Sequence, residues 1–424
     1  MSCSRPKRAG VFLSAVFWGQ VVTWLTIGFV DHKAEAGDWP QILGPHRNGI
    51  ASEETLADAW PKPGPRTVWD VPVGKGFAGV VVSGKRVILF HRMGDEDTFS
   101  SFDADTGEAL WSTGFATDFE PAIVDDDGPR AVPTIDQDRI YGLAAAGGLF
   151  CVDLQRGNLR WQRQIQKEFR APAGYFGSGT SPLVEGNLVI VNVGGDKDRA
   201  GIVAFHRDTG ETVWKATNEL ASYSSPVAAT LDGKRILLCL TRFHLVSIDP
   251  ATGKEMARLP FGQRGPTVNA AIPVIVDHRV LLTASYGIGS ELHQISPAEF
   301  KPIWKDDLLS SQYTTPIVYG GKIFGIDGRQ DGGPIALKCF DTESRQIHWT
   351  KSGLAYATLI AADEKLIVVQ TDGVVRLVTM IESGYHELAM AKVMSGTTRA
   401  LPALAHGRLY IRNERQLKCL ALTE

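Results

Sequence analysis

The sequence has little cysteine and no excess of charge of either sign. Among its 424 residues there are five cysteines, none adjacent to another and none in a Cys-x-x-Cys pair, and the formal net charge is −3. This charge gives no general attraction to nucleic acid, so we expect no nucleic-acid partner. The cysteine spacings exclude a thiolate metal site and a covalently bound haem, and we predict no metal. No nucleophile elbow occurs, so no catalytic triad is predicted.

Three of the cysteines occupy equivalent places in repeated segments. Cys151, Cys339 and Cys419 each follow a leucine by two positions, and Cys239 lies in another predicted strand. Equivalent positions in non-adjacent repeats are too far apart to form a disulfide. The sequence therefore predicts buried free thiols that act as small apolar side chains.

Long apolar runs are missing after residue 30. At the N-terminus, the basic residues Arg5, Lys7 and Arg8 are followed by the apolar residues 11–30 and by Ala34-Glu-Ala36. This pattern is typical of a cleaved secretory signal. The run is also long enough to span a bilayer, so an uncleaved anchor is the alternative. We expect residues 1–36 to be this signal peptide and the protein to be exported to the periplasm or cell envelope. Membrane contact is expected only if the segment is retained.

A nine-residue motif of the form Asp-x-x-Thr-Gly-x-x-x-Trp recurs along the chain. Residues 103–111 match it in full, residues 153–161 have Arg at the Thr position, and residues 206–214 have His at the Asp position. Asp and Gly at this spacing indicate a tight turn between two strands. The final Trp is expected to close the space between neighbouring repeats. The predicted docking residues of this kind are Trp69, Trp111, Trp161, Trp214, Trp304 and Trp349.

The spacing of these motifs predicts the fold. Together with Met256 and Leu388, the anchors lie roughly 40 to 50 residues apart, with four short β-rich runs in each interval. This is typical of an all-β propeller with four-stranded antiparallel blades. The strand around Trp69 has no blade of its own, and the last repeat lacks its final strand. Pairing the two closes the ring without a free edge. We predict eight blades over residues 67–424, with seven as the alternative, after an N-terminal extension of residues 37–66.

Each repeat starts with an inner strand that is usually marked by a proline. The positions three residues before these prolines, or before the equivalent residue where the proline is missing, are expected to surround one mouth of the central channel: Phe77, Arg130, Gly179, Tyr223, Ala270, Tyr313, Tyr356 and Arg399. Aromatic and arginine side chains in such a ring suit an anionic or aromatic ligand, or a peptide. The alternative is that they are ordinary channel-lining residues. Residues 170–179, with Tyr175 and Phe176 among glycines, are a second candidate rim loop.

With these motifs the sequence resembles the pyrroloquinoline-quinone (PQQ)-like repeat propellers of the quinoprotein alcohol dehydrogenase-like superfamily, a WD40/YVTN-like fold group. The family includes quinoprotein dehydrogenases and the BamB-like subunits of outer-membrane protein assembly. Residues 38–41, 44–49, 177–182, 223–226 and 408–413 also resemble a group of exported propellers common in planctomycete bacteria. The resemblance extends from about Asp38 to the end of the chain and implies the eight-bladed fold.

For quinoprotein dehydrogenases, the resemblance implies a vicinal cysteine pair, a calcium-binding Glu/Asn set, a catalytic Asp and an Arg near the quinone. The sequence has no vicinal cysteines and no haem motif, and only Asp327 and Asp331 are candidates for a base or ligand. We therefore expect no catalytic residues and no cofactor, PQQ with calcium being unsupported. The leading hypothesis is a non-catalytic binding scaffold whose partner is an envelope protein or a small molecule. The alternatives are a quinoprotein-type oxidoreductase and a BamB-like assembly subunit, for which a lipidation cysteine is missing.

Overall fold

A computed structural model describes residues 1–2, 37–123, 126–265 and 267–423. Apart from its first two residues, the predicted signal peptide, with Cys3, lies outside the described residues. All the described strands belong to one unit, Ala34–Glu424. Among the helices of the described part, none is long and apolar enough to cross a membrane.

The unit consists of eight four-stranded antiparallel sheets. Blade 1 contains β2 (Val81–Ser83), β3 (Arg86–Met93), β4 (Glu96–Asp103) and β5 (Ala109–Ala116). Blade 2 contains β6 (Thr134–Asp136), β7 (Arg139–Leu143), β8 (Gly148–Asp153) and β9 (Leu159–Gln164). Blade 3 contains β10 (Leu183–Glu185), β11 (Leu188–Gly195), β12 (Ala200–His206) and β13 (Thr212–Ala216). Blade 4 contains β14 (Val227–Leu231), β15 (Lys234–Leu240), β16 (His244–Ile248) and β17 (Glu255–Pro260).

Blade 5 contains β18 (Val274–Val276), β19 (Arg279–Ala284), β20 (Gly289–Ser296) and β21 (Glu299–Asp306). Blade 6 contains β22 (Ile317–Tyr319), β23 (Lys322–Arg329), β24 (Gly332–Asp341) and β25 (Ile347–Ser352). Blade 7 contains β26 (Ala357–Ala362), β27 (Lys365–Gln370), β28 (Val374–Thr379) and β29 (Glu387–Lys392). Blade 8 contains β30 (Ala403–Ala405), β31 (Arg408–Arg412), β32 (Gln416–Ala421) and β1 (Thr67–Pro72). Two short helices, α1 (Ile165–Glu168) and a 3₁₀ turn (Asp196–Asp198), lie between strands.

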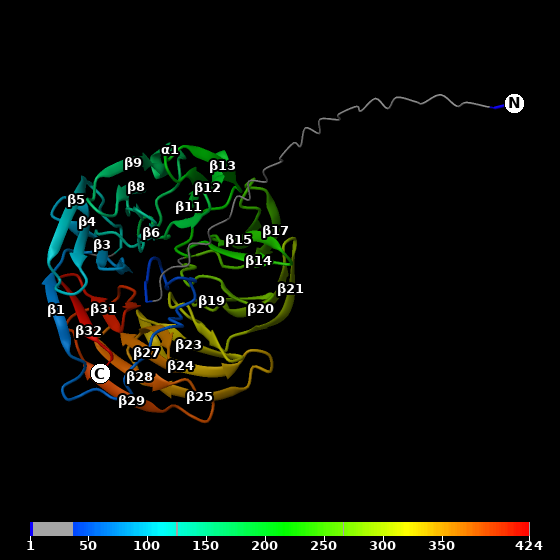
Figure 1. The fold of residues 1–424 in the computed structure, drawn as a ribbon. Helices are drawn as coiled ribbons and strands as arrows, with labels where there is room; N and C mark the ends of the chain where they lie inside the picture. The colour runs from blue at the N-terminus through cyan, green and yellow to red at the C-terminus, as the bar shows by residue number, and fades with distance from the viewer. Residues whose placement is uncertain (3–36, 124–125, 266, 424) are drawn as a thin grey trace. The chain divides into compact units, whose positions relative to one another are not determined.

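The blades form a ring, which Figure 1 shows along its axis. The first strand of the chain supplies the outermost strand of the last blade: β1 pairs antiparallel with β32, with Trp69 opposite Cys419. This pairing joins the two ends of the propeller and covers the edge of β32 that would otherwise be left free. The predicted eight-bladed architecture and its closing strand are confirmed, and the seven-bladed alternative is wrong.

The repeated motif forms the turn between the third and fourth strands of a blade. In blade 1 the Asp103 carboxylate accepts the backbone N–H groups of Asp105 and Thr106, each at 2.9 Å. Gly107 then takes a φ of +75°, a conformation that glycine adopts without steric cost. These local bonds reverse the chain so that the next strand, β5, runs back along β4.

In six of the eight blades a tryptophan at the end of the motif, or at the equivalent place in β1, reaches the following blade. Its indole N–H donates to a backbone carbonyl in the next motif turn, at 2.8–3.2 Å, in six pairs: Trp69–Ala104, Trp111–Leu154, Trp161–Arg207, Trp214–Pro250, Trp304–Thr342 and Trp349–Ile381. Between these contacts, apolar side chains of neighbouring sheets form shared clusters; one of them contains Ile190 of blade 3 and Leu237 of blade 4. The described cysteines, Cys151, Cys239, Cys339 and Cys419, are buried free thiols, as predicted.

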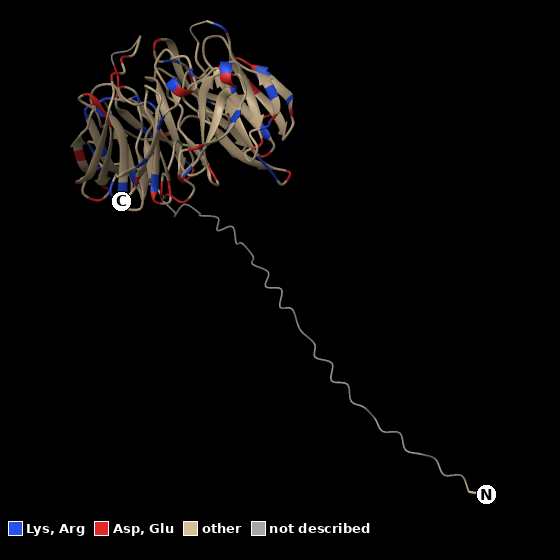
Figure 2. Ribbon diagram, turned by 90° about the horizontal axis from the view of Figure 1, so that it is seen from above, with Lys and Arg blue, Asp and Glu red and all other residues tan. Residues whose placement is uncertain are grey.

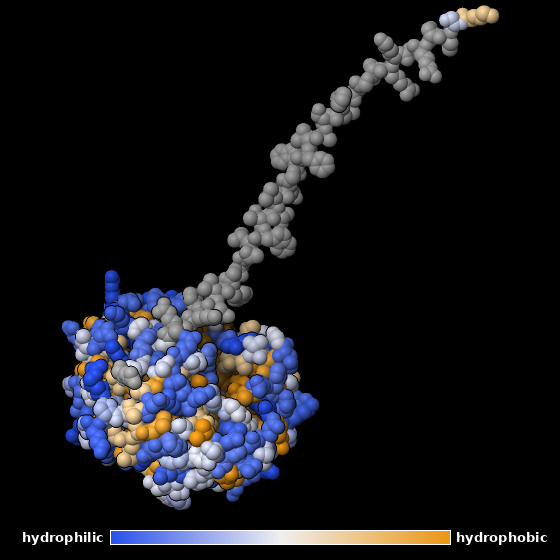
Figure 3. All heavy atoms as spheres, turned by 60° about the horizontal axis from the view of Figure 1, so that its bottom comes forward, coloured by the Kyte–Doolittle hydropathy of each residue, from blue (hydrophilic) through white to orange (hydrophobic). Residues whose placement is uncertain are grey.

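The two faces of the ring differ in what they carry. Because strand direction alternates, the loops that lead from an outer strand to the next inner strand all lie on one face, which we call the mouth face. The Asp-Gly motif turns lie on the opposite face. Figure 2 shows acidic and basic residues intermingled over loops and outer strands, with neither sign collected in one region. In the space-filling view of Figure 3, hydrophobic side chains form small groups between hydrophilic ones.

Residues 38–50, which we call the channel segment, lie inside the ring (dark blue in Figure 1). Trp39 forms a bridge with Val82 of β2, and Ile50 forms one with Ala361 of β26, on different inner strands. At the turn of the segment the guanidinium of Arg47 donates to the carbonyl oxygens of Pro182 and Pro226 at the start of blades 3 and 4. The chain's own N-terminal extension therefore fills the channel between the inner strands.

Candidate functional site

Four of the predicted mouth residues form a continuous series of contacts. The guanidinium carbons of Arg130 and Arg399 lie 5.6 and 4.8 Å from the centroid of the Phe77 ring. Arg399 also lies 6.0 Å from the centroid of the Tyr313 ring. At these distances the cations interact with the ring faces, so two arginines and two aromatic rings are held side by side on the mouth face.

Hydrogen bonds fix this cluster in place. The Tyr313 hydroxyl and Nε of Arg399 both donate to Oε1 of Gln330, each at 2.7 Å. Arg130 donates to the carbonyl oxygens of Asp126 and Gly128, and its burial lowers its pKa. The cluster is therefore rigid and cationic, and it offers aromatic faces and N–H groups to an anionic or aromatic group.

Tyr356 has a different position from the other tyrosines of the ring. Its side chain is only 1% exposed, and its hydroxyl accepts the backbone N–H groups of Tyr313 and Thr314 at 2.9 and 3.1 Å. Its ring centroid lies 4.4 Å from that of Tyr313. In this structure Tyr356 holds the loop before blade 6 in shape, beneath the surface that a ligand would contact.

Tyr223 and Gly179 meet at a second place on the mouth face. The Tyr223 hydroxyl accepts the backbone N–H of Phe176 at 2.8 Å, and the two rings lie 5.7 Å apart. A Cβ on Gly179 would lie 2.8 Å from the Tyr223 ring, so only glycine allows this approach. Ala270, the remaining predicted position, is half-buried. The predicted rim loop, residues 170–179, is thus packed against a predicted mouth residue.

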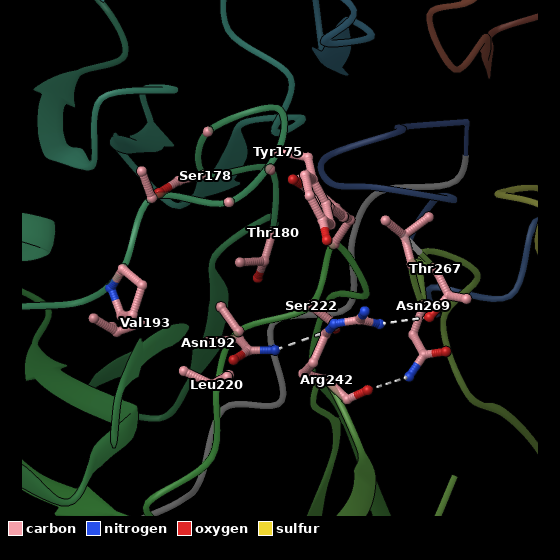
Figure 4. A pocket seen from close by; sticks show the side chains of 18 residues that line it. Tyr175, Ser178, Thr180, Asn192, Val193, Leu220, Ser222, Arg242, Thr267 and Asn269 are labelled. Carbon is pink, nitrogen blue, oxygen red and sulfur yellow. Dashed lines mark hydrogen bonds between the residues drawn. The ribbon is translucent and has the colours of Figure 1, made fainter. Parts of the chain in front are cut away.

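A pocket of about 310 Å³ lies between this loop and the mouth-face turns of blades 3 and 4 (Figure 4). Its polar lining residues are Tyr175, Ser178, Thr180, Asn192, Ser222, Tyr223, Arg242, Thr267 and Asn269. Among the described residues that line it there is no aspartate or glutamate, and Arg242 is the one charged residue. The pocket is therefore positively charged and rich in hydroxyl and amide groups.

Arg242 is held in a defined orientation. Its guanidinium donates to Oγ1 of Thr267 at 2.9 Å and to the carbonyl of Gly265 at 2.7 Å, and it lies 5.1 Å from the Phe243 ring centroid. Figure 4 shows the bond to Thr267 at the side of the pocket. Two of its five N–H groups are thus occupied.

Three polar atoms in the pocket wall are buried without a partner among the described residues: Oγ1 of Thr180, Oδ1 of Asn192 and Oδ1 of Asn269. The amide of Asn269 is oriented by carbonyl oxygens of Thr241, Arg242 and Phe261, which accept from its Nδ2 at 3.0 to 3.4 Å. The carbonyl end of the amide must therefore point elsewhere. Each of these three atoms has essentially no exposed area, so it lies behind the surface that a ligand would contact.

Sequence reasoning missed Arg242, Asn192 and Asn269. Counting back from the inner-strand prolines finds only loops that precede an inner strand, whereas Arg242 lies in the turn between β15 and β16 and Asn192 within β11. A signal was present for Asn192, because it interrupts the otherwise apolar strand of residues 188–193. Burying an asparagine side chain costs free energy unless its amide is hydrogen-bonded, so an isolated asparagine in a buried strand indicates a local polar contact.

Asp327 and Asp331, the candidates for a base or calcium ligand, are engaged elsewhere. Asp327 accepts the backbone N–H of Ser310 at 2.7 Å and pairs with Lys338 at 2.8 Å. Asp331 pairs with Arg329, and this hydrogen bond lowers its pKa. Across the described ranges no three His, Cys, Asp or Glu side chains are grouped as metal ligands would be.

Known proteins share both the repeat sequence and the fold. A family profile described as "Outer membrane protein assembly factor BamB" matches residues 51–173 and 96–351. The protein of that name from Burkholderia pseudomallei (strain K96243) is 26% identical over 200 residues, which are 46% of this chain. The match spans 45% of that relative's length.

Two solved structures have the same architecture at low sequence identity. BamB from Moraxella catarrhalis superimposes with a TM-score of 0.61 at 17% identity, over 84% of this chain and 96% of that one. The quinohemoprotein alcohol dehydrogenase from Comamonas testosteroni superimposes with a TM-score of 0.64 at 11% identity, over 92% of this chain and 82% of that one. A redox enzyme and an assembly factor thus share this fold, and the fold does not decide between them.

Proposed function

The chain belongs to the propeller family described as outer membrane protein assembly factor BamB, and from this membership we propose that it is a non-catalytic binding scaffold of the cell envelope. Its partner is an envelope protein, bound on the mouth face. The observation that carries the proposal is the arrangement of the ring. The channel segment fills the space between the inner strands, while the mouth face presents the arginine-aromatic cluster and the pocket. Arginine and aromatic side chains are those most enriched at the centres of protein interfaces.

The alternative is a PQQ-dependent oxidoreductase, and the residues present do not fit that cofactor. The cysteines of the described part are free and lie in different blades, so they offer no vicinal disulfide against a quinone ring. The acidic side chains proposed as base or ligand are paired with Lys338 and Arg329. The proposal therefore includes no redox step and no bound quinone.

A pull-down tests the scaffold role. Immobilised full chain is incubated with envelope extract of the producing bacterium, and bound proteins are identified by mass spectrometry. We expect a specific outer-membrane barrel or envelope protein, as a BamB-like assembly role requires. Arg399→Gln, which removes a mouth-face cation, should reduce its recovery severalfold, whereas Arg156→Gln on an exposed motif turn should not. Equal recovery with both variants would place the partner away from the mouth face.

A second measurement separates the scaffold from the enzyme. The chain is mixed with PQQ and calcium, and binding is followed by calorimetry and dye-linked oxidation of alcohols and sugars. We expect no stoichiometric uptake and no turnover. Uptake of one quinone per chain with turnover would reject the proposal in favour of an oxidoreductase.

A further inference from the structure

We propose that the pocket between blades 3 and 4 binds a carboxylate presented by a polypeptide, with Arg242 as its charge partner and Tyr223 as a hydroxyl donor. This inference rests on the proposed function, because it names the chemical group that the partner places on the mouth face. The group is either the carboxyl terminus of a chain or the side chain of an acidic residue.

The charge of the pocket selects an anion. Arg242 is the only charged residue among the described residues that line it. Its guanidinium keeps three N–H groups for a ligand beyond the two that bond to Thr267 and Gly265. A planar guanidinium held by two bonds and by the Phe243 ring is suited to a two-point bond with a carboxylate.

The number of cations favours a carboxylate over a phosphate. Sites for phosphorylated groups commonly gather several arginines around a charge near −2. This pocket has one guanidinium, and its described lining includes neither lysine nor histidine. A single negative charge is therefore the best match.

The Tyr223 hydroxyl supplies a further contact. The Tyr223 hydroxyl accepts from the backbone of Phe176, which leaves its own proton for a ligand oxygen. Burial raises the pKa of Tyr223, so the hydroxyl keeps this proton at neutral pH.

The size of the pocket matches a short piece of polypeptide. About 310 Å³ exceeds the volume of a carboxylate alone and leaves room for the adjoining residue. Tyr175 on the rim is 43% exposed and offers a ring face to the rest of such a segment. The loop of residues 172–179 covers one side, so the ligand enters from the mouth face.

The test uses three acetylated peptides and the full chain. Acetyl-Gly-Gly-Gly carries a terminal carboxylate, acetyl-Gly-Asp-Gly-amide a side-chain carboxylate, and acetyl-Gly-Asn-Gly-amide is the neutral match for the second. Binding is measured by calorimetry and ligand-observed NMR up to about 10 mM, the range of weak single-group affinities. We expect one or both carboxylate peptides to bind at least tenfold more tightly than the neutral one. The ratio of the two carboxylate peptides' affinities shows whether the pocket prefers a chain terminus or an acidic side chain.

Variants assign the effect to the pocket. Arg242→Gln should weaken binding of the carboxylate peptide about tenfold to hundredfold, the usual loss for a bond to a charged group. Arg242→Lys should retain part of the affinity for the carboxylate peptide. Tyr223→Phe should bind this peptide severalfold more weakly. The matched control is Arg264→Gln, an exposed arginine that lies 6.0 Å from the same Phe243 ring but does not line the pocket. It should change affinity less than about twofold. Melting temperatures establish that each variant is folded.

Three outcomes would overturn the inference: no binding of either carboxylate peptide, equal binding of the neutral peptide, or equal losses in Arg242→Gln and Arg264→Gln. The proposed function is tested independently by the pull-down. If Arg242→Gln still recovers the envelope partner in full, the carboxylate pocket is wrong and the scaffold role stands. If the unaltered chain recovers no envelope protein, the scaffold role is wrong whatever the peptides show.

Discussion

His91 is a buried histidine of blade 1 whose two ring nitrogens are both engaged. Nδ1 accepts the backbone N–H of Gly74 at 2.9 Å, so Nε2 carries the proton and bonds to Ser100 at 2.9 Å. The side chain is 2% exposed. Burial, with the nearby charge of Arg412, lowers its pKa from 6.5 to about 3. The neutral ring is therefore part of the folded structure.

This histidine should make stability depend on pH. Below pH 6.5 the unfolded chain takes up a proton at His91, whereas the folded chain does so only near pH 3. The free energy of unfolding therefore decreases as the pH falls through this window. The contribution of His91 to this decrease approaches about 1.4 kcal/mol per pH unit. In His91→Asn, the free energy of unfolding measured with urea should depend less steeply on pH between pH 6 and 4. Replacing the exposed His278 in the same way is the control, and an equal change in both would contradict the assignment.

Arg47 joins the channel segment to the blades without an acidic partner among the described residues. Its guanidinium donates to two backbone carbonyls and to Oε1 of Gln41, and burial lowers its pKa to about 9. A lysine at this position is shorter and cannot spread its donors over the same acceptors. We expect Arg47→Lys to lower the free energy of unfolding by about 2–4 kcal/mol and to speed hydrogen exchange in residues 38–50. Unchanged exchange there would show that Arg47 does not hold the segment.

At the scale of the elements, a glycine of the motif turn packs on the tryptophan of the preceding blade in four of the turns. The ring of Trp111 packs on Gly157, where a Cβ would lie 2.4 Å from a ring carbon. Gly107, Gly210 and Gly253 have the same contact with Trp69, Trp161 and Trp214. The glycine therefore serves both the turn and the joint between blades.

Two glycine substitutions separate these roles. Gly157 has a φ of +72° and Gly186 a φ of +57°, but no described atom lies within 4 Å of a Cβ at Gly186. Gly186→Ala should cost only the backbone strain, about 1 kcal/mol. Gly157→Ala should cost about 2–4 kcal/mol, because the tryptophan must also move. Denaturant unfolding measures both, and equal losses would show that the tryptophan contact carries no energy.

The blades were predictable because their signals are local. The Asp-Gly turn and the Trp that follows lie within nine residues, so even blade 7, where Leu388 replaces the Trp, could be placed by spacing. The prolines of the inner strands likewise fixed the mouth loops that hold Arg130 and Arg399. The channel segment has no repeat, and Arg47 meets Pro226 across 179 residues of sequence. Only packing of the complete ring decides such a contact.

At the scale of the whole molecule, the ring depends on one long-range strand pair. Strand β1 pairs with β32, whose residues lie about 350 positions later, while the other blades are built from consecutive strands. Trp69 in β1 also donates to Ala104 of blade 1 and packs on Gly107. One short strand therefore completes blade 8 and attaches it to blade 1.

Loss of Trp69 should loosen the ring at its closure. Trp69→Ala removes a buried indole at an interface between blades and should cost about 3–5 kcal/mol. Strand β1 is held by blade 8 and by blade 1. Hydrogen exchange measured by mass spectrometry should therefore increase in β1, in β30–β32 and in the motif turn of blade 1. Trp161→Ala, which removes the same contact within consecutive blades, should increase exchange only around blades 2 and 3. If Trp69→Ala left exchange in β30–β32 unchanged, the closing strand would not depend on this tryptophan, and the ring would be held by the β1–β32 hydrogen bonds alone.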